Sequence, residues 1–432
     1  MSEAPRKPVR AGIVVTGTEV LTGTIQDKNG PWISKELAGL GVEVSHIVVV
    51  ADRADDLEQA LRFLGADGVD IIVTSGGLGP TADDLTAEVV GTFAGREMVL
   101  DQGMEEKIAK ILAGFARRLN FDAEALRAAN RKQAVIPKGS TTIDPAGTAP
   151  GLVVPVDEGP VVIVMPGPPR ELHAMWPQAI ATHPVQAVLE RAEPYLGVML
   201  RLFGLPESEI AKSLREIEDE GLSLDRLEIT TCLRKGELEI EVRHRPGAED
   251  DLSSLVAAID ERHGRFMFSR DGETIDAQLA NLLQGRKVAT AESCTGGLLA
   301  ARLTDLDGAS AYVMGGAVVY TNESKSEVLG VPGELIEAHG AVSPEVAEAL
   351  ADGAIARFDA GLGVGITGIA GPSGGTEAKP VGYVCVCVKD SDGNTLARDP
   401  VMPGNRADVR ERTALLGMHL MRRLLLGEDF PL

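Results

Sequence analysis

The sequence predicts an α/β protein with parallel sheets, divided into two or three domains. Short apolar runs alternate with segments of helical periodicity, which is typical of parallel sheets covered by helices on both faces. Glycine-rich turns follow several of these runs, and ligands of such sheets bind at the carboxyl ends of the strands. A chain of 432 residues is also too long for one ordinary hydrophobic core.

The composition is that of a soluble globular protein, with 44% hydrophobic and 25% charged residues. A net charge of −22, an aromatic content of 3% and the lack of a basic patch argue against a nucleic-acid partner. The first residues, M-S-E-A-P-R-K-P, lack the apolar core of a secretory signal, and no run approaches a membrane span. We therefore expect a cytoplasmic protein with no membrane partner, and its acidity does not exclude small phosphorylated substrates.

The four cysteines do not suggest a disulfide framework. Cys385 and Cys387 fall on one face of a predicted strand, where apolar packing is favoured over a metal or redox site. Cys294 is in a more reactive context, but without a neighbouring histidine it ranks behind Ser293 as a nucleophile.

The first segment repeats the strand and helix pattern. Strands are expected at 9–16, 42–50 and 69–75, with helices at 29–40 and 55–64. Two strand ends carry conspicuous polar residues, namely T-G-T-E at 16–19 and S-G-G-L-G-P-T-A-D-D-L-T at 75–86. Glycines allow the backbone to approach a phosphate closely, and the helix that follows offers its unpaired amides.

Asp83 and Asp84 are expected in the first helical turn after this glycine-rich loop. Acids are favoured there for electrostatic reasons alone. An acidic pair beside a phosphate-sized loop is also how magnesium-type ions are held, by oxygen ligands with several waters retained. The two interpretations can hold together.

The middle of the chain predicts a small α+β unit after a helix at 171–189 that closes the first domain. Its expected elements are a strand at 197–204, a helix at 207–219, two alternating strands within 227–243, a turn at 245–251 and a helix to residue 262. We place the linker to the last domain at 269–272.

The last segment begins with a strand-to-helix turn at 287–299, K-V-A-T-A-E-S-C-T-G-G-L-L. Residues 288–291 predict a strand and 298–306 a helix. A hydroxyl at such a turn, here Ser293 or Thr295, faces unpaired helix amides and can present a nucleophile or accompany a bound phosphate. An ordinary helix N-cap is the structural alternative.

Further strands are expected at 312–320, 361–367 and 381–388, and helices after Ser343 and over 408–425. Polar residues stand at the ends of these elements: Ser293, Tyr320, Lys325, Thr367 and Arg406. Each has a structural reading by itself, but together they suit amide hydrolysis on a phosphorylated substrate. A serine needs a base, and a lysine with a lowered pKa or a tyrosine in relay supplies one where no histidine is suitably placed.

The N-terminal motifs resemble those of the CinA family. They are G-G-L-G-P-T-A-D-D-L-T, T-G-T-E-V-L-T-G, P-A-G-T-A-P-G at 145–151 and M-P-G-P-P-R-E at 165–171. The resemblance implies a molybdopterin-binding-like parallel-sheet domain with metal-dependent pyrophosphatase activity on ADP-ribose or related dinucleotides. Glu19, Asp83 and Asp84 would then bind a divalent metal (Mg²⁺, Mn²⁺ or Co²⁺) and handle water, with the general base left open between the carboxylates.

By the same resemblance, the phosphate contacts would come from Gly76, Gly77, Gly79 and Thr81. Family members often have D-T-N after the glutamate loop. This chain has D-K-N at 27–29, which keeps Asn29 as a binding residue.

The C-terminal motifs A-E-S-C-T-G-G, Y-x-N-x-x-K, G-I-T-G-I-A-G-P-x-G-G-T and K-P-V-G resemble the C-terminal CinA domain. The resemblance implies an α/β amidase domain, without a cofactor, that converts nicotinamide mononucleotide (NMN) to nicotinate mononucleotide and ammonia. Its implied residues are Ser293 as nucleophile, Lys325 with Tyr320 as the base system, Thr367 as a hydroxyl contact, Arg406 as a phosphate or substrate clamp, and Gly296 and Gly297 as amide donors.

The resulting interpretation is a bifunctional pyridine-nucleotide enzyme whose substrates are NMN, ADP-ribose and NAD-like dinucleotides. Its domains would span 1–175, 176–268 and 269–432, and the family resemblance implies a homodimer. The central unit resembles a KH-like module in position, but it lacks a basic G-x-x-G loop, so a spacer or dimer element is favoured over nucleic-acid binding.

Three alternatives stay open. One is a dinucleotide phosphohydrolase whose C-terminal domain binds nucleotide without catalysis. Another is a non-enzymatic protein that binds a pterin or nucleotide. The third is a competence or DNA-damage scaffold, against which the charge balance argues.

Overall fold

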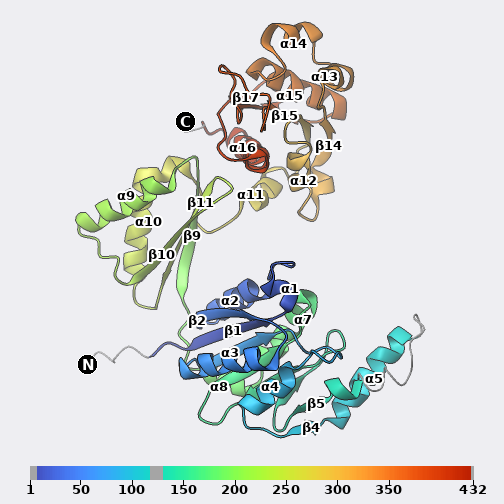
Figure 1. Ribbon diagram of the computed structural model, residues 1–432. Helices are drawn as coiled ribbons and strands as arrows, with labels where there is room; N and C mark the ends of the chain where they lie inside the picture. The colour runs from blue at the N-terminus through green and yellow to red at the C-terminus, as the bar shows by residue number, and fades with distance from the viewer. Residues whose placement is uncertain (1–6, 117–129, 430–432) are drawn as a thin grey trace. The chain divides into compact units, whose positions relative to one another are not determined.

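The computed structural model describes residues 7–116 and 130–429, which divide into two compact units, 1–196 and 197–432 (Figure 1). The predicted C-terminal domain, 269–432, lies within the second unit, whereas the predicted central domain, 176–268, is divided between the two units at residue 196. The predicted boundary at residue 175 falls inside a helix of the first unit. The division into three domains therefore stays a prediction.

The first unit is built on a mixed six-stranded sheet of order β2-β1-β3-β8-β7-β6. Four strands are parallel: β1 (Arg10–Thr16), β2 (Glu43–Val50), β3 (Ile71–Ser75) and β8 (Val161–Met165). β7 (Gly151–Pro155) and β6 (Thr141–Ile143) continue the sheet in antiparallel fashion. The parallel strands with intervening helices confirm the predicted α/β class.

Helices cover both faces of this sheet. Alternation along β1 sends Ile13 and Val15 into one core, shared with α2 (Asn29–Gly39), α7 (Pro169–Ile180) and α8 (His183–Leu189). Val14 enters the opposite core, shared with α3 (Ala54–Ala66) and α4 (Thr86–Phe93). The unit also contains α1 (Thr18–Leu21), α5 (Gln102–Ala116), and the paired strands β4 (Met98–Leu100) and β5 (Val135–Pro137).

Two predicted helix positions in this unit need correction. The single helix expected at 171–189 is two helices, because the chain turns at Thr182 and restarts with Pro184 in the first turn of α8. Asp83 and Asp84 precede α4, which begins at Thr86, so they lie in a turn and not in the first helical turn.

The second unit begins with a four-stranded sheet of order β10-β11-β9-β12. Its strands are β9 (Leu196–Phe203), β10 (Leu227–Arg234), β11 (Glu237–His244) and β12 (Met267–Ser269). A short 3₁₀ turn at Gly264–Phe266 leads into β12. Ile210 and Ile217 of α9 (Glu207–Asp219) and Leu255 and Ile259 of α10 (Glu249–His263) share one apolar core with the sheet. This arrangement confirms the predicted small α+β fold.

The C-terminal part of this unit contains a five-stranded sheet of order β14-β13-β15-β16-β17. The parallel strands are β13 (Val288–Glu292), β14 (Val313–Val318) and β15 (Leu362–Gly368). β16 (Val384–Asp390) and β17 (Thr395–Arg398) are antiparallel additions. The carboxyl ends of the three parallel strands therefore meet at one edge of the sheet.

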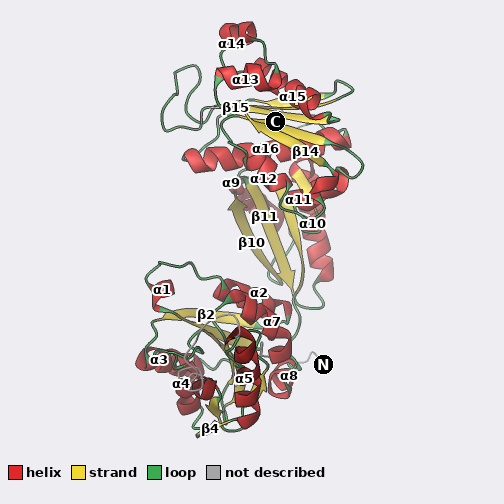
Figure 2. Ribbon diagram, turned by 90° about the vertical axis from the view of Figure 1, so that its right-hand side faces the viewer, coloured by secondary structure: helices red, strands yellow, loops and turns green. Residues whose placement is uncertain are grey.

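Helices α15 (Pro344–Phe358) and α16 (Arg406–Leu426) lie on opposite faces of this sheet (Figure 2). Gly365 of β15 allows α15 to approach closely, because a Cβ there would lie 2.0 Å from Ala347 O. Cys385 and Cys387 are buried under α15, which confirms their predicted packing role. The remaining helices are α11 (Ile275–Leu282), α12 (Leu298–Leu303), α13 (Asn322–Leu329), α14 (Gly333–His339) and a short 3₁₀ turn at Ala309–Ala311.

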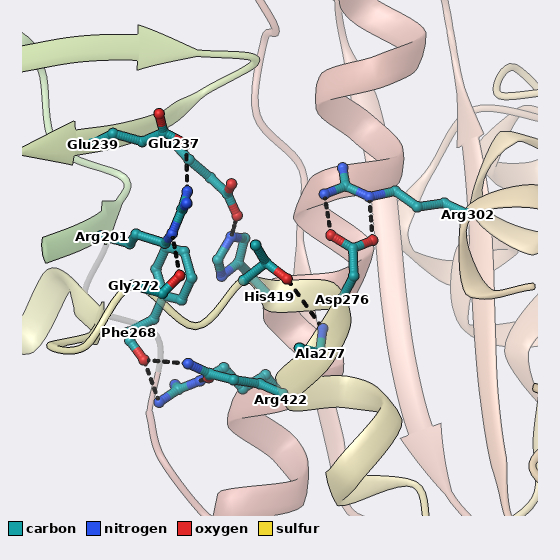
Figure 3. A network of polar contacts seen from close by, with 12 residues as sticks. Arg201, Glu237, Glu239, Phe268, Gly272, Asp276, Ala277, Arg302, His419 and Arg422 are labelled. Atoms are coloured by element: carbon teal, nitrogen blue, oxygen red, sulfur yellow. Dashed lines mark hydrogen bonds and ion pairs between the residues drawn. The ribbon is translucent and has the colours of Figure 1, made fainter. Parts of the chain in front are cut away.

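A polar contact joins α16 to the four-stranded sheet of the second unit (Figure 3). Buried His419 of α16 lies 2.7 Å from Glu237 Oε1 of β11. Nearby, Arg302 of α12 donates two hydrogen bonds to Asp276 of α11. Within the described ranges, no helix is long and apolar enough to cross a membrane.

Candidate active sites

Ser293 lies directly after β13, in the turn that leads to α12. Its backbone N–H donates to Ile366 O of β15 at 2.9 Å, which fixes the turn against the neighbouring strand end. The side chain is buried, with 8% of its surface exposed. The predicted nucleophile therefore sits at the carboxyl edge of the parallel strands.

Lys325 is the side chain that the structure brings to Ser293. Its Nζ lies 3.2 Å from Ser293 Oγ and 3.0 Å from Val319 O. A capping box of Thr321 and Ser324 starts α13 and so sets the position of Lys325 in its first turn. The lysine is 2% exposed, and this burial lowers its pKa from the ordinary 10.5, which favours the neutral amine that a general base requires.

Tyr320 and Arg406 form a second contact. Arg406 Nη2 donates to Tyr320 Oη at 2.7 Å, and Nη1 donates to Gly371 O at 2.8 Å. Only the backbone carbonyl of Tyr320 approaches Lys325 Nζ, at 3.5 Å. The Tyr320 hydroxyl therefore contacts Arg406 and not Lys325. The structure does not place this hydroxyl in the base system that the sequence predicts.

Thr367, at the end of β15, has a different environment from the one expected. Its hydroxyl donates to Ala341 O at 2.7 Å, and the residue is 1% exposed. This hydrogen bond holds the loop before α15. This hydrogen bond gives Thr367 a supporting role, and its predicted contact with the substrate stays a prediction.

The amides expected to bind an anion already have acceptors. Gly296 N donates to Ser293 O at 3.1 Å, and Gly297 N donates to Glu292 Oε2 at 3.0 Å. Glu292 also accepts from Leu299 N and Ala300 N, so one buried carboxylate caps the start of α12. These bonds leave the predicted oxyanion or phosphate role of the two glycines without support.

The sequence motifs gave Glu292 no structural role in the site, although its carboxylate caps α12. The available signal was an acid beside a predicted helix start. Arg410 of α16 was missed as well; it donates to Thr295 O at 2.8 Å and fixes the other side of the turn. Cys294 is 4% exposed, and burial raises its pKa to about 12, which keeps it a neutral thiol.

The first unit contains a cleft of about 370 Å³ at the carboxyl ends of β1, β3 and β8. Gly76 and Gly77, at the end of β3, line it with positive φ values of 107° and 67°. A Cβ on Gly77 would lie 2.2 Å from Thr86 Oγ1, so only glycine fits. The Gly76 amide donates to Met165 O and is already used at the sheet edge.

A compact turn holds the two predicted aspartates. The Thr81 hydroxyl contacts the carboxylates of both Asp83 and Asp84, and Thr81 N donates to Asp84 Oδ2 at 2.8 Å. The Thr81 hydrogen bond lowers the pKa of Asp83. Gly79 makes room for Asp84, because a Cβ there would lie 2.5 Å from Asp84 Oδ2. Thr81 and Gly79 therefore organise the acids in this structure.

Asn29, at the start of α2, connects two strand ends below the cleft. Its Nδ2 donates to Ser75 Oγ at 2.8 Å and to Gly167 O at 2.7 Å. The side chain is thus a brace for the loops after β3 and β8. These two hydrogen bonds explain why an asparagine side chain is needed at position 29, which the sequence predicts to be a binding residue.

Five acids line the cleft: Glu19, Asp52, Asp83, Asp84 and Glu171. Burial raises the pKa of Glu171, a residue of the M-P-G-P-P-R-E motif that received no role from the sequence. Among the residues that the structure describes, no three His, Cys, Asp or Glu side chains converge as metal ligands. The paired aspartates still fit the chemistry of Mg²⁺, which is commonly held by one or two carboxylates together with substrate phosphates and water.

Two family models match the two parts of this chain. The CinA C-terminal domain matches residues 272–425, and a probable molybdopterin binding domain matches residues 12–185. A CinA-like protein of Mycobacterium sp. (strain MCS) is 57% identical over 96% of this chain and 99% of its own length. Another from Mycobacterium tuberculosis (strain ATCC 25177 / H37Ra) is 55% identical over 97% of this chain and 98% of its own.

Among solved structures, a competence/damage-inducible protein from Agrobacterium tumefaciens is 39% identical, with a TM-score of 0.34, over 35% of this chain and 94% of its own. The identity to the curated relatives extends over nearly the whole chain, and the two matched domains follow in the same order as the two units. The chain therefore belongs to the CinA family, with a molybdopterin-binding-like N-terminal domain and a CinA C-terminal domain.

Proposed function

We propose that the C-terminal domain is a serine amidohydrolase that converts NMN to nicotinate mononucleotide and ammonia. The observation that carries this proposal is the buried contact between Ser293 Oγ and Lys325 Nζ. A serine hydroxyl is a weak nucleophile unless a base removes its proton, and a desolvated lysine is one of the groups able to do so. The substrate assignment rests on the family resemblance of the motifs around these residues.

In the first half of the reaction, Ser293 Oγ attacks the carboxamide carbon while neutral Lys325 takes the hydroxyl proton. The resulting ammonium of Lys325 then gives this proton to the departing NH₂ group, which leaves as ammonia. An ester between Ser293 and the nicotinate acyl group remains. The backbone carbonyl of Val319 holds the lysine in place during both transfers.

In the second half, neutral Lys325 takes a proton from water, and the hydroxide attacks the ester carbonyl. Return of the proton to Ser293 Oγ releases nicotinate mononucleotide. Arg406 is the proposed phosphate clamp, since a guanidinium binds phosphate oxygens in bidentate fashion. Its contacts with Tyr320 and Gly371 hold the guanidinium in place.

We also propose that the N-terminal domain hydrolyses the pyrophosphate of ADP-ribose or a related dinucleotide. The acid-lined cleft at the strand ends supports this second activity. Asp83 and Asp84 would hold a divalent ion, with Glu19 and Glu171 available for water or further ligands. Such an ion supplies charge neutralisation when bound, and the glycines of the loop leave room for the substrate phosphates.

The amidase proposal is tested by measuring ammonia release from NMN, with and without EDTA, for the wild type and Ser293→Ala. We expect release by the wild type, none by the variant and no effect of EDTA. Cys294→Ala serves as the matched control, since its neutral, buried thiol has no proposed role. Ammonia release that persists in Ser293→Ala would contradict the proposal.

The pyrophosphatase proposal is tested separately on ADP-ribose with added Mg²⁺, Mn²⁺ or Co²⁺. Asp83→Asn and Asp84→Asn should each abolish hydrolysis but leave ammonia release from NMN unchanged. Failure of the wild type to cleave ADP-ribose with any of these metals would favour a binding role for this domain.

A further inference from the structure

A pocket of about 400 Å³ lies within the second unit, away from Ser293 and Lys325. One wall comes from the end of β9 and the β10–β11 turn, with Phe203 and Lys235. The other comes from the segment after β17 and from α16, with Met402 and Arg412. Its size is within the range of small-molecule sites in proteins.

The pocket combines apolar walls with a cationic rim. Phe203, Met402 and Leu416 supply the apolar surface. Lys235, Arg398 and Arg412 bring three cations to this pocket, against a single acidic lining residue, Asp399, in a chain whose net charge is −22. This concentration of positive charge creates a local field that attracts anions.

The acidic residues near this pocket are already engaged. Asp399 accepts a hydrogen bond from Tyr383 Oη at 3.0 Å, and Glu411 pairs with Lys235 at 3.3 Å. The Lys235–Glu411 ion pair is solvent-exposed, and exposed ion pairs are worth little. Lys235 can therefore exchange Glu411 for a more highly charged ligand at little cost.

The aromatic wall is fixed before any ligand binds. The Phe203 ring stacks on His419, with ring centroids 3.8 Å apart and planes 10° from parallel. His419 is itself held by Glu237 (Figure 3). A rigid aromatic surface beside cations suits a ligand with a flat ring and a negative group, because ring stacking and charge-assisted hydrogen bonds then act together.

We propose that this pocket binds a mononucleotide, with its base against Phe203 and its phosphate at Lys235 and Arg412. The pocket is connected to the amidase site through α16. Arg412 lies six positions after Arg406, about 9 Å along the helix, and Met402 N donates to Gly382 O of the K-P-V-G motif. The pocket shares no lining residue with the Ser293–Lys325 pair, so mononucleotide binding there does not require turnover at Ser293.

The test uses the full chain carrying Ser293→Ala and adenosine 5′-monophosphate as the probe, which has no carboxamide. Binding is measured by isothermal titration calorimetry. In that background, Lys235→Ala/Arg412→Ala should raise the Kd by about 10-fold or more, since both proposed charged contacts with the phosphate are lost. The matched control, Lys212→Ala/Arg215→Ala on exposed α9, removes the same residue types and should leave the Kd within about two-fold.

A second measurement places the base. Phe203→Trp puts an indole in the pocket wall, whereas the native tryptophans, Trp32 and Trp176, are in the first unit. Adenosine 5′-monophosphate should quench the added fluorescence and leave the parent signal unchanged. Equal Kd values in the two double variants, no detectable binding, or no quenching specific to Phe203→Trp would each overturn the proposal.

Discussion

Lys325 Nζ lies 3.2 Å from Ser293 Oγ, although 32 residues separate the two side chains in the sequence. They meet because β13 and β14 are neighbouring parallel strands whose carboxyl ends share one sheet edge. Ser293 follows β13, and Lys325 lies in the first turn of the helix that follows β14. A buried amine beside a hydroxyl is the geometry that the proposed base and nucleophile require.

Replacement of Lys325 by methionine should remove the base and keep an apolar side chain of similar length in the buried site. We expect kcat for ammonia release to fall by about 100-fold or more, the usual contribution of a general base. Steady-state kinetics on NMN measures the loss, and thermal melting checks the fold. Lys287→Met on the exposed surface is the control, and its kcat should match the wild type.

The pH dependence should report the state of Lys325. Because burial lowers its pKa below 10.5, the neutral fraction grows as pH rises through the lowered value, and kcat/KM should rise with it to a plateau. The unfolded chain binds this proton more readily, so the free energy of unfolding should also rise with pH between the lowered value and 10.5. Both rises should be absent in Lys325→Met, and a rate that falls over this range would contradict the assignment.

Substitutions of Tyr320 and Arg406 should change different kinetic constants. Tyr320→Phe removes only the hydroxyl that accepts from Arg406, so kcat should change by no more than a few-fold. Arg406→Ala removes the proposed phosphate clamp and should raise the KM for NMN by about 10-fold or more. A loss of kcat in Tyr320→Phe as large as that in Lys325→Met would return the phenol to the base system.

Glu292 should matter for stability as well as for catalysis. Its carboxylate accepts three backbone N–H groups at the start of α12, and Glu292→Ala would leave these buried or partly buried donors without this acceptor. We expect the free energy of unfolding to fall by about 2 kcal/mol and kcat to fall as the Ser293 turn relaxes. Urea denaturation measures the first effect, and Glu292→Gln, which keeps one acceptor oxygen, should lose less.

Gly79→Ala should impair the N-terminal activity alone. The added Cβ would lie 2.5 Å from Asp84 Oδ2, so the aspartate must move. A displacement of this kind should slow ADP-ribose hydrolysis by about 10-fold or more and leave ammonia release intact. Gly39→Ala is the control, because no atom lies within 4 Å of its added Cβ. Equal hydrolysis rates for the two variants would argue against Asp84 as a functional residue.

The alternation of strands and helices was predictable because buried strands and amphipathic helices leave different periodicities in the sequence. These periodicities did not predict the first residue of α4. The Thr81 hydroxyl and amide bind the two aspartates in a local turn, and such bonds compete with helix formation. The helix therefore starts two residues after Asp84.

The motifs were enough to select Ser293 and Lys325 for one site, but not to find the supporting residues Glu292 and Arg410 or the contacts of Tyr320. Tyr320 bonds to Arg406 across 86 residues, and no spacing in the sequence reveals which way the phenol points. Likewise, the sequence predicts a helix after Ser293. It does not predict that the turn brings the Glu292 carboxylate to the backbone amides at the start of that helix. Such contacts depend on the path of the loop, which tertiary packing sets.

The most direct test of the central claim is the reactivity of Ser293 itself. The wild type and Lys325→Met are treated with a fluorophosphonate, and the labelled peptide is identified by mass spectrometry. The account predicts one label on Ser293, a rate that increases with pH, protection by NMN, and loss of labelling in Lys325→Met. Labelling at another residue, or an equal rate in Lys325→Met, would contradict the assignment of Ser293 and Lys325 as nucleophile and base.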